Sequence, residues 1–159
     1  MGSDLHTLAY FSRNISGRVG DQADALDNIL RVSRRNNLER GVTGALLFTD
    51  GWFAQVLEGP QAAVELIFEW IVLDSRHTDI RVLYLRETEQ RSFGQWSMAF
   101  AGSVDAAALA QRGGAMRQAT DNGVQPGIGQ HLIATLQKLI AETSPRSDNR
   151  LSEQPHQRR

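Results

Sequence analysis

Two neighbouring apolar segments, which meet at a turn that contains Asp50-Gly51, constrain the fold of this chain most strongly. Residues 41–48 form a nearly continuous apolar run, which is typical of a strand at the centre of a sheet. Residues 51–59 are predicted to form a second strand between two glycines. Because Asp-Gly favours the tight turns that connect antiparallel strands, the two segments are predicted to form a β-hairpin.

Strand and helix signals alternate on both sides of this hairpin. Before it, residues 5–11 are predicted to be a strand and residues 21–37 a helix. After it, Pro60 suits the first position of a second helix. The apolar stripe of that helix consists of Val64, Ile67, Phe68 and Ile71. Two further strands are predicted over about residues 80–87 and 96–101.

The order β-α-β-β-α-β is that of the ferredoxin-like, split βαβ arrangement, here with a fifth strand appended. The predicted fold class is therefore α/β, of the α+β kind, with two helices on one face of the sheet. The other face needs a cover, and the C-terminal part of the chain can supply one. Residues 127–142 are predicted to be a helix that packs on this free face or on a second subunit. Its apolar stripe consists of Ile128, Leu132, Leu136 and Leu139.

The chain is predicted to divide into three parts. Residues 1–102 form the folded domain, and residues 103–142 form a C-terminal helical extension that starts with the Ala-rich stretch 105–112. Residues 143–159 are polar and contain two prolines, so we expect a disordered tail.

Composition excludes several classes of function. The formal net charge of −1 offers no general attraction for nucleic acid or for an anionic membrane. Cysteine is absent, which removes thiol chemistry and cysteine-ligated metal, and His6, His131 and His156 show no metal spacing. No apolar run reaches the roughly 20 residues of a membrane helix, and no signal peptide is evident. We expect a cytoplasmic protein without a metal.

A polar residue lies in the middle of the second hairpin strand. Side chains alternate along a strand, so Phe53, Gln55 and Leu57 share one face. A buried primary amide without a partner costs roughly 1–3 kcal/mol. Gln55 therefore requires something polar to bind.

Other polar residues converge on the same place. Tyr10 lies on the first strand, and the stripe of the first helix begins apolar at Leu26 and ends polar at Ser33 and Asn37. These side chains and Gln55 could surround one buried polar object. A flat cofactor with hydrogen-bonding edges would suit them.

Six stretches of the sequence, in this order and with ordinary loop lengths, resemble the BLUF family of flavin-binding blue-light sensors. The resemblance covers about residues 5–100. The stretches are Leu8-Ala9-Tyr10-Phe11-Ser12, Ser33-Arg34-Arg35-Asn36-Asn37, Gly41-Val42-Thr43-Gly44-Ala45-Leu46, Phe53-Ala54-Gln55-Val56-Leu57-Glu58-Gly59, Asp74-Ser75-Arg76-His77 and Phe93-Gly94-Gln95-Trp96-Ser97-Met98.

The resemblance implies roles for the photochemical residues. Tyr10 matches the tyrosine that donates an electron and a proton toward the excited flavin. Gln55 matches the glutamine between that tyrosine and the flavin atoms N5 and O4. Its amide is a donor at one end and an acceptor at the other, so it can satisfy these groups in more than one arrangement, by rotation or by tautomer change. A new hydrogen bond to O4 would shift the flavin absorption to the red.

The resemblance also implies a cofactor-binding set and a signalling pair. Asn37 matches the asparagine that binds the O4/N3 edge, while Arg76 and His77 match a pair near the far side of the ring and its side chain. Trp96 and Met98 match a pair on strand 5 that exchanges places near the glutamine. Ser12 and Ser33 also fall near the site with less defined roles, and Ser33 is included in the predicted cofactor-binding set together with Asn37, Gln55, Arg76 and His77. The family implies FAD, with FMN and riboflavin as alternatives.

Each residue also has an ordinary structural explanation. Tyr10, Trp96 and Met98 could be plain core, and Gln55 could bind a neighbouring loop. Asn37 could cap a helix, with Asn36 taking its role if the helix phase differs by one residue. A surface ion pair with Asp74 could account for Arg76 and His77. Nothing in the sequence places the carboxylates of Glu58 and Asp74 together or decides which way Trp96 points.

Two other function classes remain beside the sensor. An acylphosphatase-like hydrolase on the same fold would need an anion-binding loop, for which Ser12-Arg13-Asn14 is a poor substitute. A flavin-free interaction module is the third class. Nothing after Phe100 resembles a catalytic domain, so we expect a non-enzymatic light sensor that acts through strand 5 and the C-terminal helices on an effector protein. Relatives of this short type form dimers or rings, and some regulate cyclic-dinucleotide phosphodiesterases.

Overall fold

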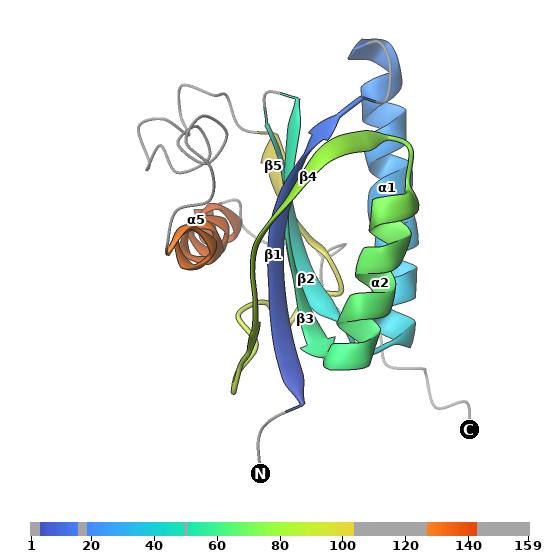
Figure 1. Ribbon diagram of the computed structural model, residues 1–159. Helices are drawn as coiled ribbons and strands as arrows, with labels where there is room; N and C mark the ends of the chain where they lie inside the picture. Colours follow the sequence, from blue (N-terminus) through green and yellow to red (C-terminus); the bar gives the residue numbers. More distant parts are fainter. Residues whose placement is uncertain (1–3, 16–18, 50, 104–126, 143–159) are drawn as a thin grey trace, which may run out of the picture.

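A computed structural model describes residues 4–15, 19–49, 51–103 and 127–142, in which a five-stranded sheet lies between helices (Figure 1). The strands are β1 (Leu5–Asn14), β2 (Thr43–Thr49), β3 (Trp52–Pro60), β4 (His77–Glu87) and β5 (Ala99–Ser103). Their order across the sheet is β4-β1-β3-β2-β5. Only the β2–β5 pair is parallel, so the sheet is mixed. The helices are α1 (Val19–Glu39), α2 (Gln61–Leu73) and α5 (Ile128–Glu142).

The predicted hairpin of β2 and β3 forms the middle of the sheet. The two strands pair antiparallel up to Thr49 and Trp52, and Gly51 has the positive φ of 79° that such a turn requires. Strand β3 pairs with β1 on its other side, so both of its edges are hydrogen-bonded. This register aligns Gln55 with Leu46 of β2 and with Tyr10 of β1.

The sheet has a separate hydrophobic core on each face. Figure 1 shows α1 and α2 on one side of the sheet and α5 on the other. The core under α1 and α2 contains Leu8, Tyr10, Leu30, Leu46, Phe53, Leu57, Val64, Ile67 and Met98. The core under α5, called the α5-side core below, contains Ala9, Phe11, Leu47, Val56, Phe93, Leu132, Leu136, Leu139 and Ile140. The ferredoxin-like sheet with a fifth strand is confirmed, and so is the C-terminal helix on its free face. The predicted stretches 105–112 and 143–159 lie outside the described residues.

Three predicted strand boundaries are wrong. Strand β1 ends at Asn14 instead of residue 11, and β4 begins at His77 instead of residue 80, because the two strands pair with each other there. Strand β5 begins at Ala99 instead of Trp96. The carbonyls of Ser97 and Met98 are bound by side chains of α1, so they are not part of a strand ladder.

No helix in the described part of the chain is both long and apolar enough to cross a membrane.

Candidate functional site

A pocket lies between the sheet and helices α1 and α2. Polar groups reach it from β1 and β3 of the sheet, from the last turns of α1, from the turn after α2 and from the first residue of β4. Its lining includes Tyr10, Ser33, Asn36, Asn37, Gln55, Asp74, Arg76 and His77, and apolar walls from Ile29, Val32, Leu46, Phe53, Ile67, Trp70 and Ile71. The structure thus brings together all six residues predicted to be photochemical or cofactor-binding.

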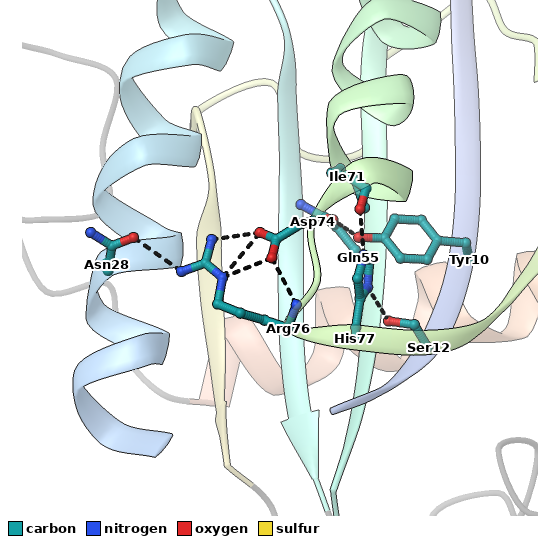
Figure 2. Close-up of polar contacts among 8 residues, drawn as sticks. All are labelled: Tyr10, Ser12, Asn28, Gln55, Ile71, Asp74, Arg76 and His77. Carbon is teal, nitrogen blue, oxygen red and sulfur yellow. Dashed lines mark hydrogen bonds and ion pairs between the residues drawn. The ribbon is translucent and has the colours of Figure 1, made fainter. Parts of the chain in front are cut away.

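Tyr10 and Gln55 form the buried centre of the site. They are opposite each other on neighbouring strands, and each is only 3% exposed. The Tyr10 hydroxyl donates a hydrogen bond to Gln55 Oε1 (Figure 2). Burial, and secondarily the charge of Asp74, raises the pKa of Tyr10 well above its usual value. The hydroxyl therefore keeps its proton and the amide oxygen is its acceptor.

The other end of the Gln55 amide faces Met98. Gln55 Nε2 donates to Met98 Sδ at 3.6 Å, and Met98 is fully buried. A thioether is a weak acceptor. The amide is thus oriented by the strong bond to Tyr10 at one end and only weakly held at the other.

Asn37 has one satisfied and one unsatisfied polar atom. Its Nδ2 donates to the carbonyl of Ser97 at 2.7 Å, whereas its buried Oδ1 has no hydrogen-bond partner among the described residues. An unpaired buried acceptor costs about 1–3 kcal/mol. The pocket therefore offers an acceptor for a ligand N–H group, and the imide N–H of a flavin ring is such a donor.

An ion pair lies at the end of the pocket next to α2. Arg76 binds the carboxylate of Asp74 at 2.5–3.0 Å and reaches Asn28 Oδ1 of α1 at 3.0 Å (Figure 2). The hydrogen bonds from Arg76 hold the pKa of Asp74 below its usual range. The salt bridge considered from the sequence is present, and it lines the pocket and connects α1 to the turn after α2.

His77 connects three elements beside this ion pair. Its Nε2 bonds the carbonyl of Ile71 at the end of α2, and its Nδ1 bonds Ser12 Oγ of β1 at 2.8 Å (Figure 2). A carbonyl can only accept, so Nε2 carries a proton, and in the neutral ring Nδ1 accepts from Ser12. Ser12 is fully buried, and its hydrogen bond to His77 connects it to a residue that lines the pocket.

Trp96 and Met98 point to opposite faces of the sheet. Met98 belongs to the core beneath α1 and α2 and contacts Gln55. Trp96 packs against the α5-side core, and its buried Nε1 has no partner among the described residues. The question that the sequence left open is thus decided in favour of Met98 on the pocket side.

Sequence reasoning missed several contributors from α1. Asn28 orients Arg76, and Arg34 Nε donates to the carbonyl of Met98 at 3.1 Å. Val32 also lines the pocket, together with Ile29 of the predicted stripe and Asn36, the alternative considered for Asn37. These three have the i, i+3, i+7 spacing of one helix face, so extending the stripe along that face would have found Val32. No spacing rule would have found Asn28 or Arg34, because their partners are distant in sequence.

The comparisons with known proteins agree with this geometry. Residues 5–99 match the family described as "BLUF: Sensors of blue-light using FAD".

The chain belongs to the BLUF family.

It is similar to the solved structure "BlrB - a BLUF protein, dark state structure", with 30% identity, a TM-score of 0.67, and coverage of 91% of this chain and 100% of the other. It is also similar to "BlsA photo-activated state", with 30% identity, a TM-score of 0.72, and coverage of 89% and 99%. The chain is a BLUF blue-light photoreceptor, and BLUF domains bind flavin.

Larger proteins share the domain. The chain is 35% identical over 95 residues to the photoactivated adenylate cyclase subunit beta of Euglena gracilis. The matched region is 59% of this chain and 11% of that protein. It is 34% identical over 94 residues to the blue light- and temperature-regulated antirepressor BluF of Escherichia coli (strain K12), 59% of this chain and 23% of the relative. The chain thus spans a small part of these curated relatives.

Proposed function

We propose that this chain senses blue light through a bound flavin and signals by rearrangement of the Gln55 amide. The single observation that carries the proposal is the buried series Tyr10–Gln55–Met98, in which one amide connects an oxidisable phenol to a weakly held thioether. The cofactor is proposed to be FAD, with FMN and riboflavin as alternatives. A solved relative, BlrP1 of Klebsiella pneumoniae, is described "with FMN and cyclic diGMP".

The polar atoms of the pocket fit such a ring. Asn37 would accept a hydrogen bond at Oδ1, and Gln55 would meet the ring from the sheet. Ser33, Arg76 and His77 would lie along its edge and side chain. The bound flavin supplies absorption of blue light and, once excited, a strong oxidant.

Tyr10 is proposed as the electron donor of the site. Loss of an electron makes a phenol strongly acidic, and the acceptor hydrogen-bonded to its hydroxyl is Gln55 Oε1. The proton therefore moves toward the amide as the electron leaves. This transfer disturbs the one strong bond that orients Gln55.

Reorientation of the Gln55 amide changes which of its atoms contacts Met98. If the amide turns over, Oε1 replaces Nε2 next to Met98 Sδ, and a donor–acceptor contact becomes a contact of two acceptors. Met98 must then move, together with the segment that precedes β5. Trp96, two residues earlier, packs against the α5-side core, so this segment and α5 are the proposed output route.

The output is proposed to be contact with another protein, without catalysis by this chain, in the cytoplasm. The named relatives include an antirepressor, cyclases and a protein solved with cyclic diGMP, so partners differ within the family. An effector that handles cyclic dinucleotides is the proposed partner, and the sensor is proposed to be a homo-oligomer.

The first test is an absorption spectrum of the purified protein before and just after blue light. A flavin spectrum that shifts slightly to the red and relaxes in darkness supports the proposal. A protein that stays colourless after flavin is added contradicts it and favours the hydrolase or interaction-module alternatives. Bound flavin without a reversible shift contradicts the Tyr10–Gln55 switch alone.

A further inference from the structure

Glu58 is a buried carboxylate that the proposed photochemistry does not use. It lies three residues after Gln55 on β3, so its side chain points to the opposite face of the sheet, and it is fully buried. Its Oε1 accepts from the backbone N–H of Ser92 at 2.6 Å. Its Oε2 accepts from the backbone N–H of Phe93 at 2.9 Å and from Thr43 Oγ1 at 3.4 Å. Burial raises the pKa of the Glu58 carboxyl, and the hydrogen bonds from Phe93, Ser92 and Thr43 act in the opposite direction.

Arg91 binds the same turn to the sheet from a second side. Its guanidinium donates to Thr43 Oγ1 at 2.9 Å, to the Glu58 carbonyl at 3.1 Å and to the Gly41 carbonyl at 2.8 Å. Residues 91–93 are therefore attached to β3 and to the start of β2. Two side chains make this attachment: Glu58 of β3 binds the backbone of the turn, and Arg91 of the turn binds the sheet.

The attached turn contacts α5. Phe93 is fully buried in the α5-side core, and Gln137 Nε2 of α5 donates to the carbonyl of Ser92 at 3.4 Å. Further along the chain, Met98 contacts Gln55 in the pocket. Only residues 94–97 separate these two points, and among them Trp96 packs against the α5-side core.

We propose that Glu58 is a positioning residue for the light signal. It attaches residues 91–93 to the strand that carries Gln55, so a movement of Met98 is taken up by residues 94–98 and reaches α5 through Trp96. Without this attachment the same movement would spread over the whole connection between β4 and β5. The inference rests on the proposed function, since it needs a light-driven movement at Met98.

The test compares flavin-loaded wild type with Glu58→Gln, in the dark and in blue light. The substitution keeps the size of the side chain, but it places an NH₂ group against an N–H donor or leaves that donor unpaired. The readouts are the red shift, its dark-recovery rate, and hydrogen exchange over residues 128–142. We expect the red shift to persist, because Tyr10 and Gln55 are untouched. We expect the light–dark difference in hydrogen exchange of α5 to fall below about half of its wild-type value. We expect dark recovery to be about ten-fold faster than in wild type, which is equivalent to one hydrogen bond weakened by ~1.4 kcal/mol.

Two further variants keep the test decisive. Glu65→Gln removes a carboxylate from an exposed position on α2 and is expected to match wild type. Thr43→Val removes a donor to Glu58 and an acceptor of Arg91 with little change of shape. Thr43→Val is expected to speed dark recovery and to reduce the exchange difference in α5 less than Glu58→Gln does. If Glu58→Gln does not fold, Thr43→Val is used in its place.

Each contrary result has a distinct meaning. A wild type that shows the red shift but no light-dependent exchange in α5 overturns the inference. Wild-type recovery and exchange in Glu58→Gln also overturn it, and Thr43→Val takes the place of Glu58→Gln if that variant does not fold. A Glu65→Gln protein with the same faster recovery and smaller exchange difference overturns it as well. A wild type without any red shift instead overturns the proposed function itself.

Discussion

At the scale of single residues, the site is built around one amide with unequal partners. Gln55 has a buried hydroxyl donor at one end and a thioether at the other. Next to it, Asn37 leaves a buried oxygen unpaired. Because an unpaired buried acceptor is costly, Asn37 is suited to a polar ligand, and the roles proposed for both amides can be tested by small substitutions.

Tyr10→Phe is expected to bind flavin and to lose the reversible red shift. Only a hydroxyl is removed, so the pocket keeps its shape, but the oxidisable group and the proton bound to Gln55 Oε1 are gone. Gln55→Leu, which removes the acceptor instead, is expected to behave alike. The measurement is the light-minus-dark difference spectrum, and a normal photocycle in Tyr10→Phe would contradict the donor role.

Asn37→Ala is expected to weaken flavin binding by about ten-fold or more, because a buried hydrogen bond to the ligand is worth ~1–3 kcal/mol. Asn36→Ala is the matched control. Asn36 also lines the pocket, but it is only half-buried, and we expect little change. Flavin titration followed by fluorescence measures both, and the reverse ranking would assign the ligand contact to Asn36.

At the scale of elements, the close packing of α5 against the sheet depends on one glycine. Gly129 lies against the ring of Tyr84 on β4, and a Cβ built there would come within 1.8 Å of Tyr84 Cδ1. Leu132, Leu136, Leu139 and Ile140 supply apolar contacts along the rest of the helix. The first turn of α5 can therefore approach β4 only because this position has no side chain.

Gly129→Ala is expected to destabilise the protein by about 1–3 kcal/mol through overpacking. Helix propensity alone predicts the opposite sign, a gain of about 1 kcal/mol. Denaturant unfolding decides between the two effects. Adding Tyr84→Ala to Gly129→Ala should make the glycine substitution neutral or favourable. A clash effect that persists without the Tyr84 ring would contradict this account.

At the scale of the whole molecule, the pocket and the proposed output helix lie on opposite faces of one sheet. The pocket lies under α1 and α2, whereas α5 covers the other side (Figure 1). Strand β3 contributes to both faces through alternate side chains, and the segment before β5 contributes Met98 to one face and Trp96 to the other. Under the proposed function, communication between the faces would pass through the sheet and through the chain that enters β5.

Burial of Tyr10 predicts how stability responds to alkaline pH. The pKa of Tyr10 in the folded state is raised by burial above the ordinary value of 10.0 that it has in the unfolded chain. Above that pH the unfolded state loses a proton that the folded state keeps. The free energy of unfolding is thus unaffected by Tyr10 below this pH and falls as the pH rises above it, by about 1.4 kcal/mol per pH unit.

Unfolding of wild type and Tyr10→Phe, measured between about pH 9 and 11, isolates this contribution, since all other groups titrate in both proteins. The wild type is expected to lose stability more steeply. Parallel curves would show that the hydroxyl ionises in the folded protein.

The sequence by itself determined the order of the elements, the central hairpin, the presence of the C-terminal helix and the convergence of Tyr10, Asn37 and Gln55. These follow from local rules: strand side chains alternate, helical residues recur every three or four positions, and Asp-Gly favours a tight turn. The resemblance to BLUF sensors supplied the candidate roles, which no local rule could give.

Only the tertiary structure decided where β5 begins, which way Trp96 and Met98 point, and what Glu58 binds. Asn37 and Arg34 capture the carbonyls of residues 97 and 98, and this delays the strand to Ala99. The side chain of Glu58 accepts hydrogen bonds from the backbone N–H groups of residues 92 and 93. These partners are more than thirty residues apart along the chain, so neither periodicity nor propensity encodes them, and they exist only once the sheet and α1 have packed.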